Sequence, residues 1–278
     1  MKAILKLIRL NNLLIVAFTQ VLVAGALVRI DLLNENNWLP LGVLIISTIL
    51  IAAGGYIIND YYDIKIDYVN RPDRVTIGTI ITRREAMAMH FVVTLIGLLL
   101  ALLLSWKTGL IALFCAYFLW YYSRYLKKKP LVGNITVALL TALSLMQVAV
   151  YYQKSYMITG IYAVFAFALS LIRELIKDME DVDGDRMHGG RTVPILWGIP
   201  KTKKLLLGFI VLFITLMMTW MSVADNQRLN VYFMLLSLPL MLVVAYLFRA
   251  DTKKHYHRLS LFCKLLMLGG VLSMLMIA

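Results

Sequence analysis

The sequence predicts an all-α integral membrane protein, and two observations carry that prediction. Of its 278 residues, 61% are hydrophobic and only 15% are charged, whereas a soluble domain is about 45–50% apolar and about 25% charged. A mean hydropathy of +0.81 means that the chain has more apolar side chain than one core of this size hides from water. The excess must face lipid, which excludes a soluble enzyme, a disordered chain and a disulfide-stapled secreted domain.

Long apolar runs divide the chain into about nine predicted spans, since a helix needs about twenty apolar residues to cross the hydrocarbon core. The spans are predicted at 11–28, 39–58, 86–105, 109–125, 132–152, 156–176, 203–223, 231–248 and 259–277. No run shows the polar–apolar alternation of a membrane barrel. The basic start resembles a secretory signal, but its apolar stretch is too long and lacks a small-residue cleavage site. We therefore expect an uncleaved first helix.

The basic residues predict how the chain is oriented. All but four of the 28 fall on one side of this topology, the exceptions being Arg29, Lys107, Lys154 and Arg228. The positive-inside rule then places the N-terminus in the cytoplasm and the C-terminus outside the cell (inner) membrane. The net charge of +13 reflects topology and attraction to the lipid bilayer. With no aromatic-plus-basic motif, no nucleic-acid partner is expected.

Acidic residues gather in two short stretches, Asp60–Asp73 and Glu174–Asp185. In the first, Asn59, Asp63 and Asp67 recur every four residues, and Pro and Gly are absent from 59 to 70. A continuing helix places these side chains on one face, about 6 Å apart along the axis. Stacked carboxylates repel unless a cation neutralises them. Hard oxygen ligands on a rigid face suit Mg²⁺ shared with a diphosphate.

The second stretch combines cations and acids at helical spacing. Arg173, Lys177, Asp181 and Asp185 stand four residues apart, with Asp178 one position off that line. Gly184 is expected to end or bend the helix near Asp185. Two cations followed by two acids predict a site for an anion and a metal together. A merely solvated face would more often alternate the signs of its charges.

Both stretches lie on the predicted cytoplasmic side, at the ends of the second and sixth spans. Ionisable groups at the ends of membrane helices indicate a functional site. We therefore expect the nine helices to surround a central cavity on which the two stretches converge. Its substrate would be anionic at one end and, inside a membrane, apolar at the other. An isoprenoid diphosphate meets both conditions.

The sequence resembles the UbiA superfamily of intramembrane prenyltransferases. The family's first signature, NDxxDxxxD, is matched by Asn59, Asp60, Asp63 and Asp67, and its second by Lys177, Asp178, Asp181, Gly184 and Asp185. The resemblance covers nearly the whole chain and implies a single transmembrane prenyltransferase domain over 1–278. Within the family, both motifs look most like the digeranylgeranylglyceryl phosphate synthase branch, and next like the chlorophyll synthase type.

The resemblance also implies roles for individual residues. Magnesium would be held by Asp63, Asp67, Asp181 and Asp185, and the catalytic set would add Asn59, Asp60 and Asp178. The residues expected to bind the substrate diphosphate are Arg71, Arg74, Tyr121, Lys127, Asn134, Arg173, Lys177 and Arg191. After Arg74 the family usually continues with a Pro-x-Pro-Ser-Gly turn, whereas this chain has Val75 to Gly78. This departure leaves the acceptor open.

The expected reaction is Mg²⁺-dependent transfer of an isoprenyl group from an allylic isoprenyl diphosphate donor to a lipophilic acceptor, with release of pyrophosphate. The best candidate acceptor is a (geranylgeranyl)glycerol phosphate lipid. An aromatic acceptor of the quinone or tetrapyrrole type is the alternative.

Two other functions are weighed against this one. A CDP-alcohol phosphotransferase would need a contiguous Asp-Gly-x-x-Ala-Arg signature, which is absent. A membrane cation transporter should have acids near mid-span or broken helices in matching halves, and the span interiors are almost free of acids.

The sequence also predicts roles for a pair of glycines and for the histidines. Gly54 and Gly55 are expected to allow close helix packing. Structural or solvated roles are expected for the histidines, with His255 and His257 in a basic loop and His90 within a span.

Overall fold

The computed structural model describes residues 2–223 and 226–277, with all their side chains except those of Lys2 and Arg74. Eight helices in this part of the chain are long and apolar enough to cross a membrane. The remaining expected span, 109–125, corresponds to α5 (Trp106–Tyr121), which continues into the π-helical turn η3 (Tyr122–Leu126). The predicted all-α membrane fold is therefore confirmed.

Most predicted spans are extended by a few residues at one or both ends. The other elements are α1 (Lys2–Leu7), α2 (Leu10–Leu22), η1 (Val23–Leu27), α3 (Glu35–Asn70), η2 (Pro72–Arg74), α4 (Arg83–Leu104), α6 (Val132–Tyr152), α7 (Tyr156–Glu180), α8 (Val182–Met187), α9 (Val193–Trp197), α10 (Ile199–Val223), α11 (Gln227–Arg249), α12 (Lys253–Leu272) and η4 (Ser273–Met276).

Helix α3 carries the first signature because nothing in its sequence stops it earlier. It is capped by Asn34, whose side chain accepts a hydrogen bond from the Asn36 N–H, and runs for 36 residues from Glu35 to Asn70. Arg71 then leaves the helical region (φ −151°, ψ 63°) directly before Pro72. A residue that precedes proline is pushed away from helical angles by the proline ring. The signature residues consequently occupy the last turns of one continuous helix.

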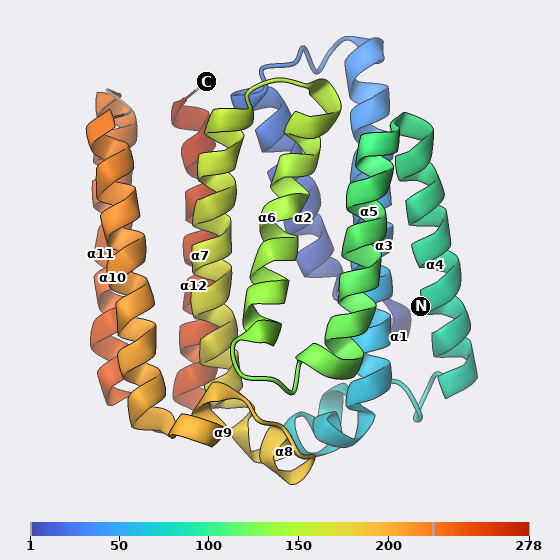
Figure 1. The fold of residues 1–278 in the computed structure, drawn as a ribbon, viewed down its shortest axis with the longest axis vertical. Coiled ribbons are helices and arrows are strands. Elements are labelled where there is room, and N and C mark those ends of the chain that lie inside the picture. Colours follow the sequence, from blue (N-terminus) through green and yellow to red (C-terminus); the bar gives the residue numbers. More distant parts are fainter. Residues whose placement is uncertain (1, 224–225, 278) are drawn as a thin grey trace. The chain divides into compact units, whose positions relative to one another are not determined.

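The chain forms two compact units, and the first comprises Met1–Lys127 with Leu143–Thr159. In it, α3, α4 and α5 pack against one another (Figure 1). Glycines make this packing close: a Cβ at Gly54 would collide with Thr94 Oγ1, and one at Gly55 would lie 2.8 Å from Leu119 Cδ1. The expected packing role of these two glycines is confirmed.

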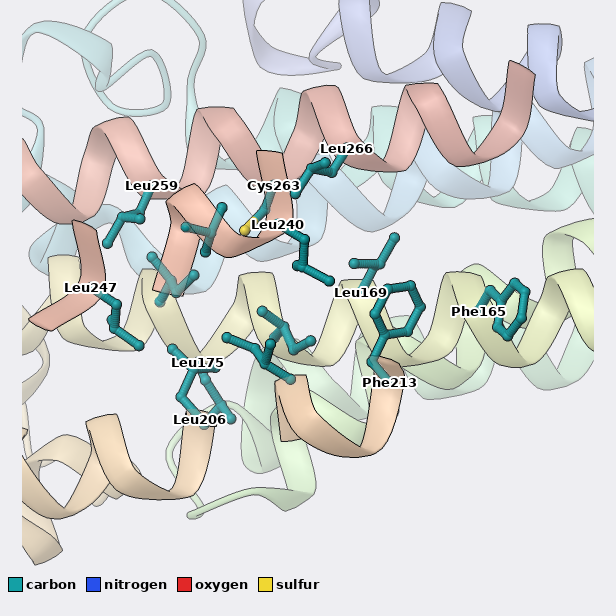
Figure 2. Packing of buried hydrophobic residues seen from close by; sticks show 14 of the residues in the cluster. Phe165, Leu169, Leu175, Leu206, Phe213, Leu240, Leu247, Leu259, Cys263 and Leu266 are labelled. Atoms are coloured by element: carbon teal, nitrogen blue, oxygen red, sulfur yellow. The ribbon is translucent and has the colours of Figure 1, made fainter. Parts of the chain in front are cut away.

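The second unit comprises Lys128–Ala142 with Gly160–Ala278. Its core is an apolar cluster supplied by α7, α10, α11 and α12, part of which Figure 2 shows. The ring of Phe165 meets those of Phe213 and Phe233 edge-on, with centroids 5.8 and 6.0 Å apart. This core holds the end of α7, and with it the start of the second signature, in place.

Two local predictions in the second unit are wrong. Helix α7 ends at Glu180 and the chain turns at Asp181 (φ −100°, ψ 9°), whereas Gly184 lies inside α8. The break therefore comes three residues before the glycine, and Arg173 and Asp185 do not share one continuous helix. His255 and His257 lie in the first turns of α12, not in a loop, because the Thr252 side chain caps that helix at the His255 N–H.

Gly97 offers a test of the packing in the first unit. Ser47 Oγ donates a hydrogen bond to Gly97 O at 2.7 Å, and a Cβ at Gly97 would lie 3.0 Å from Ser47 O and 2.9 Å from Ile51 Cγ1. Gly97→Ala should force α3 and α4 apart and lower the melting temperature in detergent by several degrees, since overpacking costs about 1–3 kcal/mol.

Gly42→Ala on α3 is the matched control, because a Cβ there meets nothing within 4 Å. Its melting temperature should stay the same or rise, since alanine favours a helix over glycine by about 1 kcal/mol. Equal melting curves for the two variants would contradict the close approach of α3 and α4.

Candidate active site

The first signature lies on α3 in the first unit, as predicted. Asn59, Asp60, Asp63 and Asp67 occupy the last turns of that helix. Asp63 is buried, with 4% of its surface exposed, and the other three are half-buried. Carboxylates this secluded need compensating partners, because a buried charge is tolerated only when it is paired.

Lys127 supplies the partner of Asp63. It follows η3 directly, and its Nζ forms an ion pair with Asp63 Oδ2. Tyr121, at the end of α5, stacks on Tyr117 with ring centroids 5.7 Å apart and planes 11° from parallel. Both Tyr121 and Lys127 were expected to bind the substrate diphosphate. Lys127 contacts the first signature directly, whereas Tyr121 belongs to an aromatic cluster along α5 and η3.

Arg9 is a site residue that sequence reasoning missed. Its guanidinium donates hydrogen bonds to Asp60 Oδ1 at 2.8 Å and Asn59 Oδ1 at 3.4 Å, and it lies over the Tyr56 ring at 4.8 Å. Burial lowers the pKa of Arg9, but Asp60, Tyr56 and Asp67 together raise it above its ordinary value, so the guanidinium is protonated. The sequence did contain a signal for Arg9, since it is the last basic residue before the first predicted span. The basic start was explained by membrane topology alone.

The segment after α3 is tied down at its start. The Arg71 N–H donates to Asp67 O at 2.8 Å, and Lys6 Nζ donates to Asp73 O at 2.6 Å. Arg74 lies in η2, and its side chain is outside the described set. Arg71 is thus placed at the end of the signature helix, and a contact of the N-terminal segment holds the turn that follows.

In the second unit, Asn134 contacts the second signature. Asn134 is buried on the first turn of α6, and its Nδ2 donates to Asp178 Oδ2 at 2.8 Å. Asp181 occupies the turn between α7 and α8, and the buried Asp185 donates its N–H to Asp181 O at 3.1 Å. The three predicted aspartates of this signature therefore lie along one short stretch of chain with a fixed backbone.

Glu174, the first residue of the second acidic stretch, is a second residue to which the sequence assigned no role in the site. It is buried, accepts from Arg173 Nη1 at 2.9 Å and forms an ion pair with Lys177 Nζ at 3.1 Å. Both cations that were expected to meet a diphosphate therefore share one carboxylate. The i,i+3 spacing of Glu174 and Lys177 was the available signal.

Arg191 is exposed, in the segment between α8 and α9. Its N–H donates to Lys128 O at 2.9 Å, and Lys128 Nζ donates to His188 O at 3.0 Å. These bonds join the segment before α6 to the one after α8. His90 Nδ1 lies 2.9 Å from Gly54 O, which agrees with its expected structural role.

The donor set suits a hard divalent cation held jointly with a phosphate. In the described residues, no three His, Cys, Asp or Glu side chains come together as a complete metal cage. Magnesium is usually bound by one or two carboxylates together with substrate phosphates and water. The aspartates of α3 offer such carboxylates on one face, so these residues fit Mg²⁺.

Comparison with known proteins identifies the family. Residues 14–266 match the model of the UbiA prenyltransferase family. The chain belongs to this family. A relative from Thermococcus gammatolerans named digeranylgeranylglyceryl phosphate synthase is 32% identical over 282 residues, covering 100% of this chain and 99% of the relative. The protein is therefore a membrane prenyltransferase, and the phosphotransferase and transporter alternatives are set aside.

Two solved structures share the fold. One, described as digeranylgeranylglyceryl phosphate synthase in membranes, aligns with a TM-score of 0.77 at 24% identity and covers 99% of this chain and 96% of that chain. A UbiA homolog from Archaeoglobus fulgidus bound to DMAPP and Mg²⁺ aligns with a TM-score of 0.63 at 18% identity and covers 98% of each chain. Both likenesses concern the arrangement of the helices.

The ion pair between Asp63 and Lys127 can be tested through stability. Lys127→Met should leave the buried Asp63 carboxylate without its cation and destabilise the protein by about 3 kcal/mol, since breaking a buried pair leaves an uncompensated charge. Adding Asp63→Asn to Lys127→Met should recover most of the lost melting temperature. A double variant as unstable as the single one would contradict the pairing.

Proposed function

We propose that this protein transfers an isoprenyl group, with Mg²⁺, from an allylic isoprenyl diphosphate to a (geranylgeranyl)glycerol phosphate lipid. The observation that carries the proposal is the face of α3 on which Asn59, Asp60, Asp63 and Asp67 combine hard oxygen ligands with the cations Arg9 and Lys127. The name of the Thermococcus gammatolerans relative, which matches over the whole chain, supports the choice of acceptor.

We propose that residues 1–278 act as a single transmembrane prenyltransferase domain. Asp63, Asp67, Asp181 and Asp185 would hold Mg²⁺, and Asn59, Asp60 and Asp178 complete the catalytic set. The residues that would bind the donor diphosphate are Arg71, Arg74, Tyr121, Lys127, Asn134, Lys177 and Arg191. The Archaeoglobus fulgidus homolog bound to DMAPP and Mg²⁺ supports this combination of ligand and metal.

The proposed mechanism depends on the positive charges that would surround the leaving diphosphate. Bound Mg²⁺ would supply Lewis-acid stabilisation of the leaving diphosphate. Lys127 holds Asp63 in place before substrate arrives, and Arg9 does the same for Asp60. Positive charge from Lys127 and Arg71 offsets negative charge that develops as the allylic C1–O bond breaks. The acceptor hydroxyl oxygen then bonds to C1, its proton is released, and pyrophosphate leaves. Apolar helix surfaces exclude water, which would otherwise capture the cation as an alcohol.

We further propose the orientation in the cell membrane. The basic segments that follow α3 and precede α12 lie on the cytoplasmic side, with the N-terminus and the mouth of the active site. The distribution of Lys and Arg supports this arrangement. An alkaline phosphatase fused to the C-terminus, which is active only outside the cytoplasm, should be active, whereas a fusion in the 124–129 loop should be inactive. The reverse pattern would contradict the orientation.

The metal assignment predicts a large loss of activity. Asp63→Ala and Asp181→Ala should each lower pyrophosphate release at least a hundredfold, because each removes a carboxylate that would hold the metal. EDTA should abolish turnover. The assay supplies purified protein with geranylgeranyl diphosphate, Mg²⁺ and geranylgeranylglycerol phosphate.

Glu35→Ala is the matched control, an acid on the same helix that is exposed at its far end. It should leave turnover unchanged. Full activity in Asp63→Ala and Asp181→Ala would refute the metal assignment. Running an aromatic acid beside the glycerol lipid tests the acceptor, and product from the aromatic acid alone would favour the quinone-type reaction.

A further inference from the structure

Helices α7 and α12 of the second unit run antiparallel (Figure 1), and two side-chain contacts join them. At one end, His257 Nδ1 lies 2.9 Å from Glu180 Oε1. Toward the other end, the Tyr162 hydroxyl lies 2.9 Å from Ser273 Oγ. These two contacts establish which residues of the two helices face each other between them.

Arg173 and Lys264 face each other on this register. Arg173 lies seven residues before Glu180, and Lys264 lies seven after His257, so each is about 10 Å further into its span than that contact. Seven residues are close to two full helical turns, so both side chains lie on the faces that α7 and α12 turn toward each other at the Glu180–His257 contact. Two like charges facing each other inside membrane-spanning segments are unfavourable, and such residues indicate a functional site.

One N–H group of Arg173 lacks a hydrogen-bond acceptor among the described residues. Its Nη1 donates to Glu174, which also pairs with Lys177, and its buried Nε has no hydrogen-bond partner among the described residues. A buried donor without an acceptor is unfavourable by about 1–3 kcal/mol. An anion with several acceptor oxygens, placed between Arg173 and Lys264, would supply the acceptor and separate the like charges.

The donor diphosphate has a nearer cation than Arg173. Arg173 precedes Asp181 by eight residues, nearly all of them in α7, which is about 12 Å along the helix axis, whereas Lys177 precedes Asp181 by only four residues, about 6 Å. A diphosphate held at Asp181 and Asp185 would therefore meet Lys177 first. This leaves Arg173 for a second anion, and the spacing leaves room between the two anions for the reacting carbon and a glycerol hydroxyl.

We propose that Arg173 and Lys264 bind the phosphate of the acceptor lipid. The proposal rests on the proposed function, and it assigns Arg173 to the acceptor instead of the donor diphosphate. A phosphate monoester carries a charge of about −1.5 to −2 at pH 7 and three acceptor oxygens, which matches two cations. The single carboxylate of an aromatic acid matches one cation. Recognition of this phosphate would select the glycerol phosphate lipid over its dephosphorylated form.

The test compares two acceptors, geranylgeranylglycerol phosphate and geranylgeranylglycerol, with geranylgeranyl diphosphate as donor. Wild type should prefer the phosphate form at least tenfold in kcat/KM. Lys264→Met should raise KM for the phosphate form at least tenfold and leave KM for the donor and for the dephosphorylated acceptor unchanged. Lys264→Arg should retain the preference. Lys254→Met, the same change at an exposed position of α12, should behave like wild type.

The outcomes separate the two proposals. If wild type uses the phosphate lipid and Lys264→Met keeps the wild-type KM for it, this inference is wrong and the proposed function stands. If wild type uses an aromatic acid and no glycerol lipid, the proposed function itself fails. Should Lys264→Met not fold, as judged by gel filtration and melting, the wild-type comparison still decides: equal kcat/KM for both glycerol acceptors overturns the phosphate site.

Discussion

The structure depends on partners for carboxylates that lie in membrane-spanning helices. Isolated charges are unstable in an apolar medium, yet Asp60, Asp63 and Glu174 are all secluded. Each is paired with a cation: Asp60 with Arg9, Asp63 with Lys127, and Glu174 with Arg173 and Lys177. In the second signature the partner of Asp178 is an amide, because Asn134 donates a hydrogen bond to it. Without these partners, the carboxylates would be buried with no compensation for the water that they lose.

The same pairs prepare the protein for a reaction in which charge develops. A cation that already neutralises a carboxylate stands beside the position that a metal and a diphosphate would occupy, so little reorganisation is needed as the leaving group forms. Close packing of the helices also supports this arrangement. Gly54 and Gly55 let α4 and α5 approach α3 closely just before the signature begins, and the aromatic and aliphatic core of the second unit holds the end of α7. Rigid helices therefore carry the charged residues in both units.

The second unit also has two cations deep in its membrane-spanning helices. Arg173 and Lys264 lie deeper in their spans than the second signature, and they face each other across antiparallel helices. A bisubstrate enzyme with two anionic substrates needs two anion sites at a distance that keeps the reacting atoms between them. In this protein the second anion site would decide which acceptor is used, while the carboxylates serve a step that any acceptor shares.

The sequence by itself determined the membrane fold, the spans and the two signatures, because hydropathy and helical spacing are local properties that survive without knowledge of the fold. It also placed Asn59 to Asp67 on one helix, since no proline or glycine interrupts that stretch. The tertiary structure alone decided the partners: Arg9 reaches Asp60 across 51 positions, Lys127 reaches Asp63 across 64, and Lys264 faces Arg173. It also decided that α7 ends at Glu180, whereas the sequence had predicted an end or bend at Gly184. Such pairings depend on how helices pack, and packing is set by the fit of side chains that lie far apart along the chain.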